Sequence, residues 1–366
     1  MRFRRLFSLL LAILLLSFGI LPAVQAARGA PGSYEFGHGA NINLDGPQME
    51  QALQLAGNLR LDWLTADLSW SALMPDPTAE LDFSVLDQMM KTAGQNQIAV
   101  MLSITQPPAW AMTEQGPNAN LTAVFIQMLA GRYPDVLQAI ELFPGANTPA
   151  GWGAAPNPAA YWGMFTAVQT RLQENGIGLI LIAGGLEVLP ADPGESINEV
   201  DFLRGLYQAG ANSLLVVSLR YANLTGQPAD PAQGSETRIL RRYEAVRQVM
   251  VDNNQANAML WITRLGLPDG TINPGEIQIR EAAQQSAWLS QAAAQLRAQL
   301  FIGMAVMADL NAANPAGPAH KTANLLAGGG HPFSKVYREI IQQNEPGILD
   351  APPGRVKTEA FNKLRP

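Results

Sequence analysis

Residues 98–105 read Ile98-Ala99-Val100-Met101-Leu102-Ser103-Ile104-Thr105, an almost continuous apolar run of the kind found in strands buried on both faces. A helical pattern at 82–93 precedes this run, and another at 121–132 follows it. A buried strand between two helices is typical of a parallel sheet whose crossover helices cover it. The stretch therefore predicts an α/β fold class.

The same strand-and-helix unit recurs along the chain. We expect strands at 34–40, 59–67, 98–105, 139–143, 177–183, 213–219, 258–263 and 301–307, and helices at 47–57, 82–93, 121–132, 158–174, 198–209, 235–252, 275–299 and 331–343. Eight such units in 366 residues predict a single-domain (β/α)8 TIM barrel, whose usual size is about 250 residues plus insertions.

An open doubly wound sheet is the alternative architecture. It would place a Gly-x-Gly-x-x-Gly turn after the first strand, and the sequence has none there. The glycine clusters Gly184-Gly185 and Gly328-Gly329-Gly330 are interpreted as flexible loops rather than phosphate-binding turns. The barrel remains the preferred prediction.

The first residues have the pattern of a targeting segment. Three arginines precede an apolar run, Leu6 to Val24, which ends in the small residues Val24-Gln25-Ala26-Ala27. This pattern predicts a signal peptide at 1–26 cut after Ala26, and an uncleaved membrane anchor is the alternative. We expect a linker at 27–33, the barrel at 34–345, an irregular tail at 346–366 and a secreted or extracytoplasmic location, with no stable membrane span after cleavage.

Charge and residue usage exclude several classes of function. The net charge is −6, and removal of the first 26 residues, which hold three arginines and no acid, leaves −9. Nucleic-acid binding needs a basic surface and is not expected. Without cysteine no thiolate site can form, and three histidines leave little for a metal site, so we expect neither a metal nor a cofactor.

Five stretches, taken in order, have a further resemblance to known proteins. They are 63–70 with 82–87, Thr105-Gln106-Pro107-Pro108-Ala109-Trp110-Ala111, Gly131-Arg132-Tyr133, Ile140-Glu141-Leu142-Phe143-Pro144-Gly145-Ala146-Asn147, and Leu260-Trp261-Ile262-Thr263-Arg264-Leu265-Gly266. Together they resemble strand-end motifs of the cellulase-like (β/α)8 glycoside hydrolases, nearest to the β-xylosidase and iduronidase branch. The resemblance spans about 34–343 and implies the same barrel, with a site at the carboxyl ends of its strands.

Departures from that family pattern fall on its catalytic positions. Retaining members use two carboxylates about 5–5.5 Å apart, one as acid/base and one as nucleophile. The resemblance puts Gly145 at the acid/base position and Arg264 at the nucleophile position. Arginine can neither attack a sugar nor accept a proton. A supporting second-strand arginine corresponds to Thr65, and a sixth-strand motif to Leu219-Arg220-Tyr221.

The leading hypothesis is therefore a secreted pseudo-glycosidase that binds an oligosaccharide or polysaccharide without retaining catalysis. The alternative is an active O-glycosyl hydrolase that uses relocated carboxylates such as Glu141 and Glu187. Strand alternation places Glu141 deep in the barrel, where it is interpreted as a buried carboxylate paired with a cation, Arg264 being one candidate. Glu187 lies at the end of the fifth predicted strand. It is interpreted as a solvated acid of the following loop, and in an active enzyme it would be a catalytic candidate.

Aromatic residues that follow the strands are the candidate sugar contacts, because sugar C–H faces stack on Trp and Tyr rings. The candidate binding residues are Trp70, Trp110, Asn147, Trp152, Tyr221 and Arg264. Arg264 would suit an anionic group such as a uronate carboxylate. Trp261, opposite in parity to Arg264, is expected to face the helices.

Overall fold

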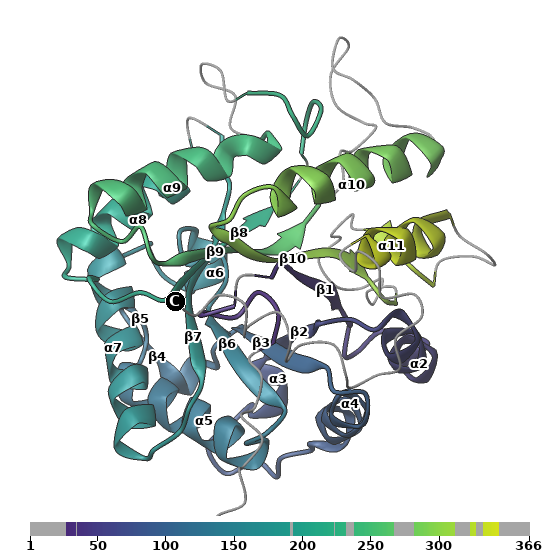
Figure 1. Cartoon of the computed structure of the whole chain (residues 1–366). Coiled ribbons are helices and arrows are strands. Elements are labelled where there is room, and N and C mark those ends of the chain that lie inside the picture. The colour runs from purple at the N-terminus through teal and green to yellow at the C-terminus, as the bar shows by residue number, and fades with distance from the viewer. Residues whose placement is uncertain are drawn as a thin grey trace, which may run out of the picture.

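The computed structural model describes residues 27–33, 35–190, 193–222, 224–231, 238–266, 282–311, 323–326 and 332–343. The predicted signal peptide and tail, at 1–26 and 346–366, lie outside these residues. Strand β1 (Gly37–Asn41) pairs in parallel with β2 (Trp63–Ser69) on one side and with β10 (Ile302–Asp309) on the other. The sheet therefore closes on itself, which confirms the predicted (β/α)8 barrel (Figure 1).

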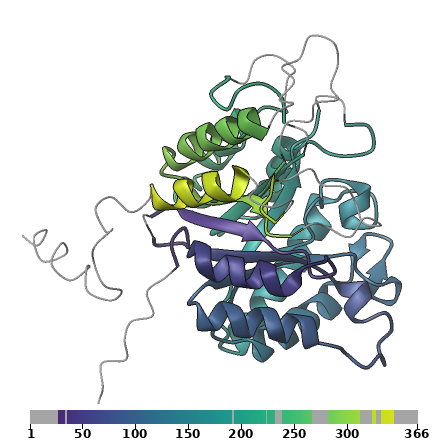
Figure 2. The same ribbon diagram turned by 90° about the vertical axis from the view of Figure 1, so that its right-hand side faces the viewer.

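Around the barrel, the strands between β2 and β10 follow chain order. They are β3 (Ala99–Thr105), β6 (Leu137–Leu142), β7 (Ile180–Glu187), β8 (Val216–Tyr221) and β9 (Met259–Leu265). The outer helices are α2 (Met49–Leu59), α4 (Ser84–Gln95), α5 (Ala119–Arg132), α7 (Pro158–Glu174), α8 (Glu199–Gln208), α9 (Tyr243–Asp252), α10 (Ala282–Arg297) and α11 (Pro332–Gln342). Figure 2 shows α11 lying along β1, where the Tyr337 hydroxyl donates to the Gly39 carbonyl.

Short elements occupy the connecting loops. They are α3 (Trp70–Leu73), η1 (Ala109–Ala111), the hairpin of β4 (Met112–Thr113) with β5 (Gly116–Pro117), α6 (Pro149–Trp152), η2 (Leu240–Arg242) and β11 (Ala323–Asn324), which extends the sheet beside β10. Among the described residues, no helix combines the length and apolar composition needed to cross a bilayer.

Asparagine side chains explain where several helices begin. The Oδ1 atoms of Asn118, Asn157 and Asn198 accept backbone N–H groups of the first turns of α5, α7 and α8, respectively. Such caps satisfy donors that have no partner inside the helix. These caps therefore fix the first turn of each helix where it follows a loop at the carboxyl ends of the strands.

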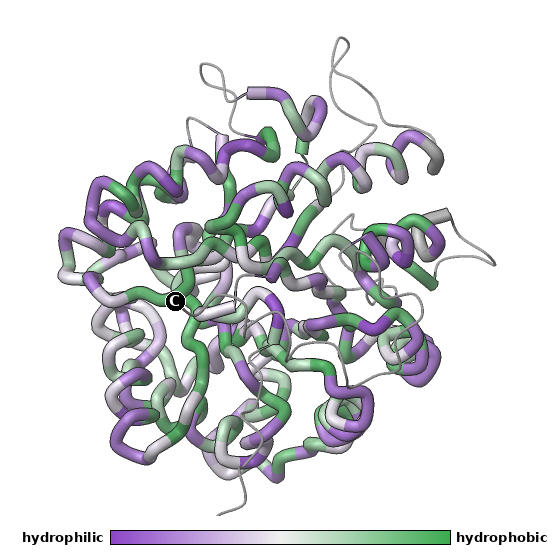
Figure 3. The backbone as a smooth tube through the Cα atoms, viewed as in Figure 1, coloured by the Kyte–Doolittle hydropathy of each residue, from purple (hydrophilic) through white to green (hydrophobic). Residues whose placement is uncertain are grey.

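Two hydrophobic regions stabilise the barrel. The larger one lies between the strands and the helices, and the strands accordingly form much of the hydrophobic part of the chain (Figure 3). The smaller one fills the barrel interior near the amino-terminal ends of the strands, and it contains Trp63, Met101, Trp261 and Met304. Trp63 and Trp261 meet edge to face with centroids 4.9 Å apart. The prediction that Trp261 faces the helices is wrong, because β9 does not keep simple alternation as far as Arg264.

The first described residues close this end of the barrel. The Trp63 indole donates to the Arg28 carbonyl (2.6 Å), and the Trp261 indole donates to the Gly29 carbonyl (2.9 Å). Gly29 has φ +80°, and a Cβ there would lie 2.4 Å from the Gly303 carbonyl oxygen. The stretch predicted as a linker therefore packs into the barrel, at a position that only glycine fits.

Candidate functional site

A buried carboxylate lies at the centre of the barrel. Glu141, on β6, is fully buried, and its two oxygens accept hydrogen bonds from Ser103 on β3 (2.7 Å), Ser218 on β8 (2.7 Å) and Thr263 on β9 (2.6 Å). These side chains project inward from three other strands at about the same level. The barrel therefore has a polar layer above its apolar base, built around one anion.

The cation that neutralises Glu141 is Arg220, from β8. Its Nη2 lies 2.7 Å from Glu141 Oε2 and 2.7 Å from Asp67 Oδ1 of β2. Burial alone would lower the pKa of Arg220, but Asp67 and Glu141 together raise it above its ordinary value. Glu141 is therefore paired with Arg220 and not with Arg264, the partner considered from the sequence. The guanidinium of Arg220 bridges the two carboxylates.

Arg264 is paired with Asp67 instead. Its Nη2 donates to Asp67 Oδ2 at 3.1 Å, and only 7% of the residue is exposed. Asp67 thus contacts two arginines, Arg220 and Arg264, from β8 and β9. The position that the family resemblance assigns to a nucleophile is occupied by a buried cation in an ion pair.

A further carboxylate, Asp309, ends β10 near this network. Asn41 Nδ2 donates to Asp309 Oδ1 at 2.9 Å. Burial raises the pKa of Asp309 to about 6, against the opposing effects of the Arg264 charge and the Asn41 hydrogen bond, and the Asp67 charge adds to the rise. This carboxyl group therefore titrates closer to neutral pH than an exposed aspartate does.

Glu187 ends β7 on the other side of Arg220. Burial raises the pKa of Glu187, and the Arg220 charge opposes that shift. A Cβ built on Gly145 would lie 3.1 Å from Glu187 Oε1, so the carboxyl lies directly beside the position that the resemblance assigns to the acid/base. Asn147 fixes the backbone there: its Oδ1 accepts from Glu187 N and its Nδ2 donates to Glu187 O, both at 2.9 Å.

A bulge in β7 places Glu187 at this point. The register with β8 shifts between Ala183 and Leu186, and Gly184 and Gly185 have φ +120° and +58°. The Gly185 N–H donates to Ser218 Oγ, and its carbonyl accepts from Gly145 N. The interpretation of Gly184-Gly185 as a flexible loop is wrong: the pair forms a hydrogen-bonded bulge inside the strand, a device that re-aims side chains.

Most of the candidate sugar-stacking rings lie inside the protein. Trp70 is fully buried and stacks on Phe125, and Trp152 and Tyr221 are each 1% exposed. The Trp152 indole donates to the Gln115 carbonyl, and the Tyr221 hydroxyl donates to the Leu240 carbonyl. Trp110 is partly buried, meets Trp70 edge to face and donates to the Met74 carbonyl. Among these four aromatic side chains, only that of Trp110 is partly exposed.

The hydroxyl groups that surround Glu141 were not predicted from the sequence. Ser103, Ser218 and Thr263 interrupt apolar strands at matching levels, and this interruption was the available signal. Among the described residues, no group of three or more His, Cys, Asp or Glu side chains is arranged to hold a metal ion.

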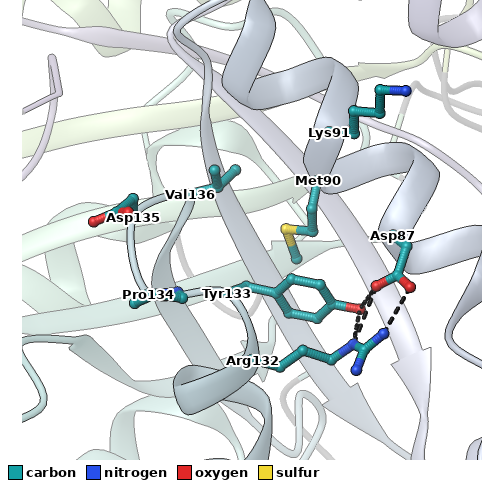
Figure 4. A pocket seen from close by; sticks show the side chains of 8 residues that line it. All are labelled: Asp87, Met90, Lys91, Arg132, Tyr133, Pro134, Asp135 and Val136. Atoms are coloured by element: carbon teal, nitrogen blue, oxygen red, sulfur yellow. Dashed lines mark hydrogen bonds and ion pairs between the residues drawn. The ribbon is translucent and has the colours of Figure 1, made fainter.

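A surface pocket of about 280 Å³ lies away from the carboxyl ends of the strands, between α4 and the turn that joins α5 to β6 (Figure 4). Arg132 donates to both Asp87 oxygens, the Tyr133 hydroxyl donates to Asp87 Oδ1, and Arg132 covers the Phe83 ring at 4.3 Å. These contacts join α4 to the end of α5. We therefore interpret this pocket as a result of the packing of α4 against the end of α5.

The (β/α)8 fold is similar to that of several solved glycoside hydrolases. A glucosidase from Croceicoccus marinus matches with a TM-score of 0.59 and 13% identity, over 87% of this chain and 67% of that one. A family 39 glycoside hydrolase from Bacteroides cellulosilyticus WH2 matches with a TM-score of 0.56 and 13% identity, over 83% of this chain and 63% of that one. XacCel5A in complex with cellopentaose matches with a TM-score of 0.54 and 11% identity, over 83% of this chain and 98% of that one. At these identities the likeness concerns the fold. No protein-family model and no curated protein matches the chain.

Proposed function

We propose that the protein is a secreted glycoside-hydrolase-like barrel that binds carbohydrate without retaining catalysis. The observation that carries the proposal is the Asp67–Arg264 ion pair at the end of β9, where the resemblance implies a nucleophilic glutamate. A fixed guanidinium cation would oppose the positive charge that develops on the sugar ring during hydrolysis. Export follows from the predicted signal peptide, with cleavage after Ala26.

The state of Glu141 supports the same proposal. One of its oxygens accepts from two hydroxyl groups and the other from a hydroxyl and Arg220. A carboxylate offers about four acceptor positions, and these contacts occupy them. Glu141 is thus a structural anion, which removes it from the relocated catalytic pair considered from the sequence.

The proposed ligand is an oligosaccharide or polysaccharide. Trp110 supplies a partly exposed ring at the end of β3, and Arg264 supplies donors at the end of β9. The fold neighbour XacCel5A has been described in complex with cellopentaose, which makes that sugar a reasonable first probe. The proposed binding requires neither a metal nor a cofactor.

An active O-glycosyl hydrolase remains the second candidate. The contact between Glu187 and the Gly145 position favours it, because an acid with a raised pKa lies where the family has its acid/base. Its partner carboxylate would be Asp67 or Asp309 rather than Glu141. This mechanism predicts turnover that Glu187→Gln abolishes.

A glycan array probed with the mature chain, run beside a turnover assay on aryl β-glycosides, distinguishes the two functions. We expect saturable binding without turnover, and Arg264→Ala should weaken binding while the exposed Arg204→Ala, on α8, should not. Turnover that one carboxylate substitution abolishes would overturn the proposal in favour of the hydrolase. No binding to any glycan would overturn both.

A further inference from the structure

The residues that follow the predicted signal-peptide cleavage point are built into the base of the barrel, at the amino-terminal ends of the strands. Ala27, the first of them, packs against the apolar cluster that fills this end. Ala30 belongs to that cluster and is only 3% exposed. The chain therefore enters the fold at the residue directly after Ala26.

The segment is held by its own hydrogen bonds and by one ion pair. The Ala27 carbonyl accepts from the Ala30 N–H at 3.0 Å, and the Gly29 N–H donates to the Glu35 carbonyl at 2.7 Å. The Arg28 side chain pairs with the Glu35 carboxylate, with Nε 2.8 Å from Oε2. These contacts fold the segment back on itself, so it is not available as an extended strand.

Two barrel strands hold the same segment from inside. The Trp63 indole of β2 donates to the Arg28 carbonyl, and the Trp261 indole of β9 donates to the Gly29 carbonyl. The backbone at Gly29 passes so close to the start of β10 that a Cβ there would lie 2.4 Å from the Gly303 carbonyl oxygen. The segment is therefore wedged between strands, and it can leave only if this end of the barrel opens.

A peptidase that removes a signal peptide must hold the chain on both sides of the bond that it cuts. It recognises small side chains at positions −3 and −1, which here are Val24 and Ala26. Extended peptides are bound through their backbone N–H and C=O groups. The carbonyls of Ala27 and Arg28 already accept hydrogen bonds inside the protein. Cleavage of the folded chain therefore requires local opening of the barrel base.

We propose that closure of the barrel base occludes the processing site, so that the bond after Ala26 is cut before the barrel closes and resists cleavage afterwards. The inference rests on the proposed export through a cleaved signal peptide, and it adds the order of the two events. A chain that closed first would keep residues 1–26. Their attachment point, Ala27, lies at the end of the barrel opposite the candidate site.

Three substrates for a purified signal peptidase test this order. The first is the folded full chain in detergent micelles, with residues 1–26 intact. The second has about six Gly/Ser residues inserted between Ala27 and Arg28, which keeps the residues at the bond and moves it up to about 20 Å from the base. The third is an unfolded synthetic peptide of residues 15–35. Mass spectrometry identifies the bond that is cut.

We expect the peptidase to cut the peptide and the folded insertion variant after Ala26. The folded wild-type chain should be cut about a hundredfold more slowly, because only its rare open form is a substrate. Trypsin, which cuts after arginine, gives an independent measurement at the Arg28–Gly29 bond. It should spare this bond in both folded chains and cut it in the peptide.

Trp261→Phe weakens the closure while keeping an aromatic ring at the base. It should raise the rate at which the peptidase cuts the folded chain about tenfold, since roughly one hydrogen bond is lost. Trp288→Phe, on α10, is the matched control, because that indole also donates to a glycine carbonyl, of Gly226 in the loop after β8, at 2.9 Å. It should leave the cleavage rate unchanged.

Equal cleavage of the folded wild-type chain and the insertion variant overturns this inference. So does trypsin cleavage after Arg28 that is as fast in the folded chain as in the peptide, or an equal rate for Trp261→Phe and Trp288→Phe. If the peptidase leaves even the peptide uncut after Ala26, the predicted signal cleavage is wrong and the proposed order falls with it. The trypsin result would still show whether the base is closed, so the two failures are distinguishable.

Discussion

Asp67 on β2 and Arg264 on β9 form an ion pair at the carboxyl ends of the strands, with Arg264 Nη2 3.1 Å from Asp67 Oδ2. Two other strands, β1 and β10, lie between them on the short way round the barrel. Asp67 also contacts Arg220, so one carboxylate neutralises part of two guanidinium charges. Removal of the Asp67 carboxylate would leave the positive charges of Arg220 and Arg264 without their shared partner.

Asp67→Asn should therefore lower the free energy of unfolding. Breaking a buried pair costs about 3 to 5 kcal/mol, and we expect a smaller loss here because 31% of the Asp67 side chain is exposed. Urea unfolding measures the loss. Asp87→Asn, which breaks the exposed pair with Arg132, is the matched control and should have a smaller effect. Equal effects would show that the Asp67 network adds nothing beyond a surface pair.

Glu141→Gln should destabilise the barrel more strongly, by about 3 to 5 kcal/mol. The substitution leaves Arg220 without its buried partner and places an NH2 group among hydroxyl donors that need acceptors. Thermal and urea unfolding test this expectation, with the exposed Glu174→Gln as the control. A stable Glu141→Gln variant would contradict the structural role assigned to this carboxylate.

Asp309→Asn should change how stability depends on pH. The pKa of Asp309 is about 6 in the folded chain and 3.8 as its ordinary value, so the folded state binds the proton more tightly. Wild type should therefore lose stability as the pH rises from about 4 to about 6, on the order of 2 to 3 kcal/mol in total. The variant lacks this loss and should gain relative to wild type across that window.

Unfolding curves at pH 4, 5, 6 and 8 check the expectation, with exposed Asp252→Asn as the control. The amide oxygen of the new asparagine can still accept from Asn41, so that hydrogen bond is retained. A difference between Asp309→Asn and wild type that stays constant with pH would show that Asp309 does not titrate in this range.

Gly185→Ala should destabilise the chain by more than about 2 kcal/mol. Its φ is +58°, and a Cβ there would lie 2.5 Å from the Cβ of Pro144 and 2.9 Å from the Glu141 carboxyl carbon. Gly163→Ala is the contrasting variant, since no atom lies within 4 Å of a Cβ at that position in α7. It should stabilise the chain by about 0.5 to 1 kcal/mol. Denaturant midpoints of the two variants should move in opposite directions.

The barrel could be predicted because its strands are apolar runs separated by amphipathic segments, and α7 occupies the predicted residues 158–174. Several boundaries moved. The predicted helix at 235–252, for example, corresponds to α9, which begins at Tyr243 after the 3-10 turn η2. Such end effects depend on local hydrogen bonds that hydrophobic periodicity does not report.

The candidate site was predicted less completely, because simple alternation fails at bulges. The pairing of β6 with β3 is regular from Ala139 to Leu142, and the inward direction of Glu141 followed from parity. Register shifts in β7 and in the β8–β9 pairing then decide where Glu187, Arg220 and Arg264 point. Their partners depend on strands distant in sequence, so the bridging role of Arg220 between Asp67 and Glu141 could not be inferred from spacing.

The carbonyl groups of Arg28 and Gly29 have a consequence for how the chain is assembled during synthesis. Their indole donors, Trp63 and Trp261, follow them by 35 and 232 residues. The earliest described residues to leave the ribosome therefore wait for most of the chain before both contacts can form, and such long-range contacts are slow to close. A chain truncated before Trp261 lacks the donor of the second contact and cannot complete this end of the barrel.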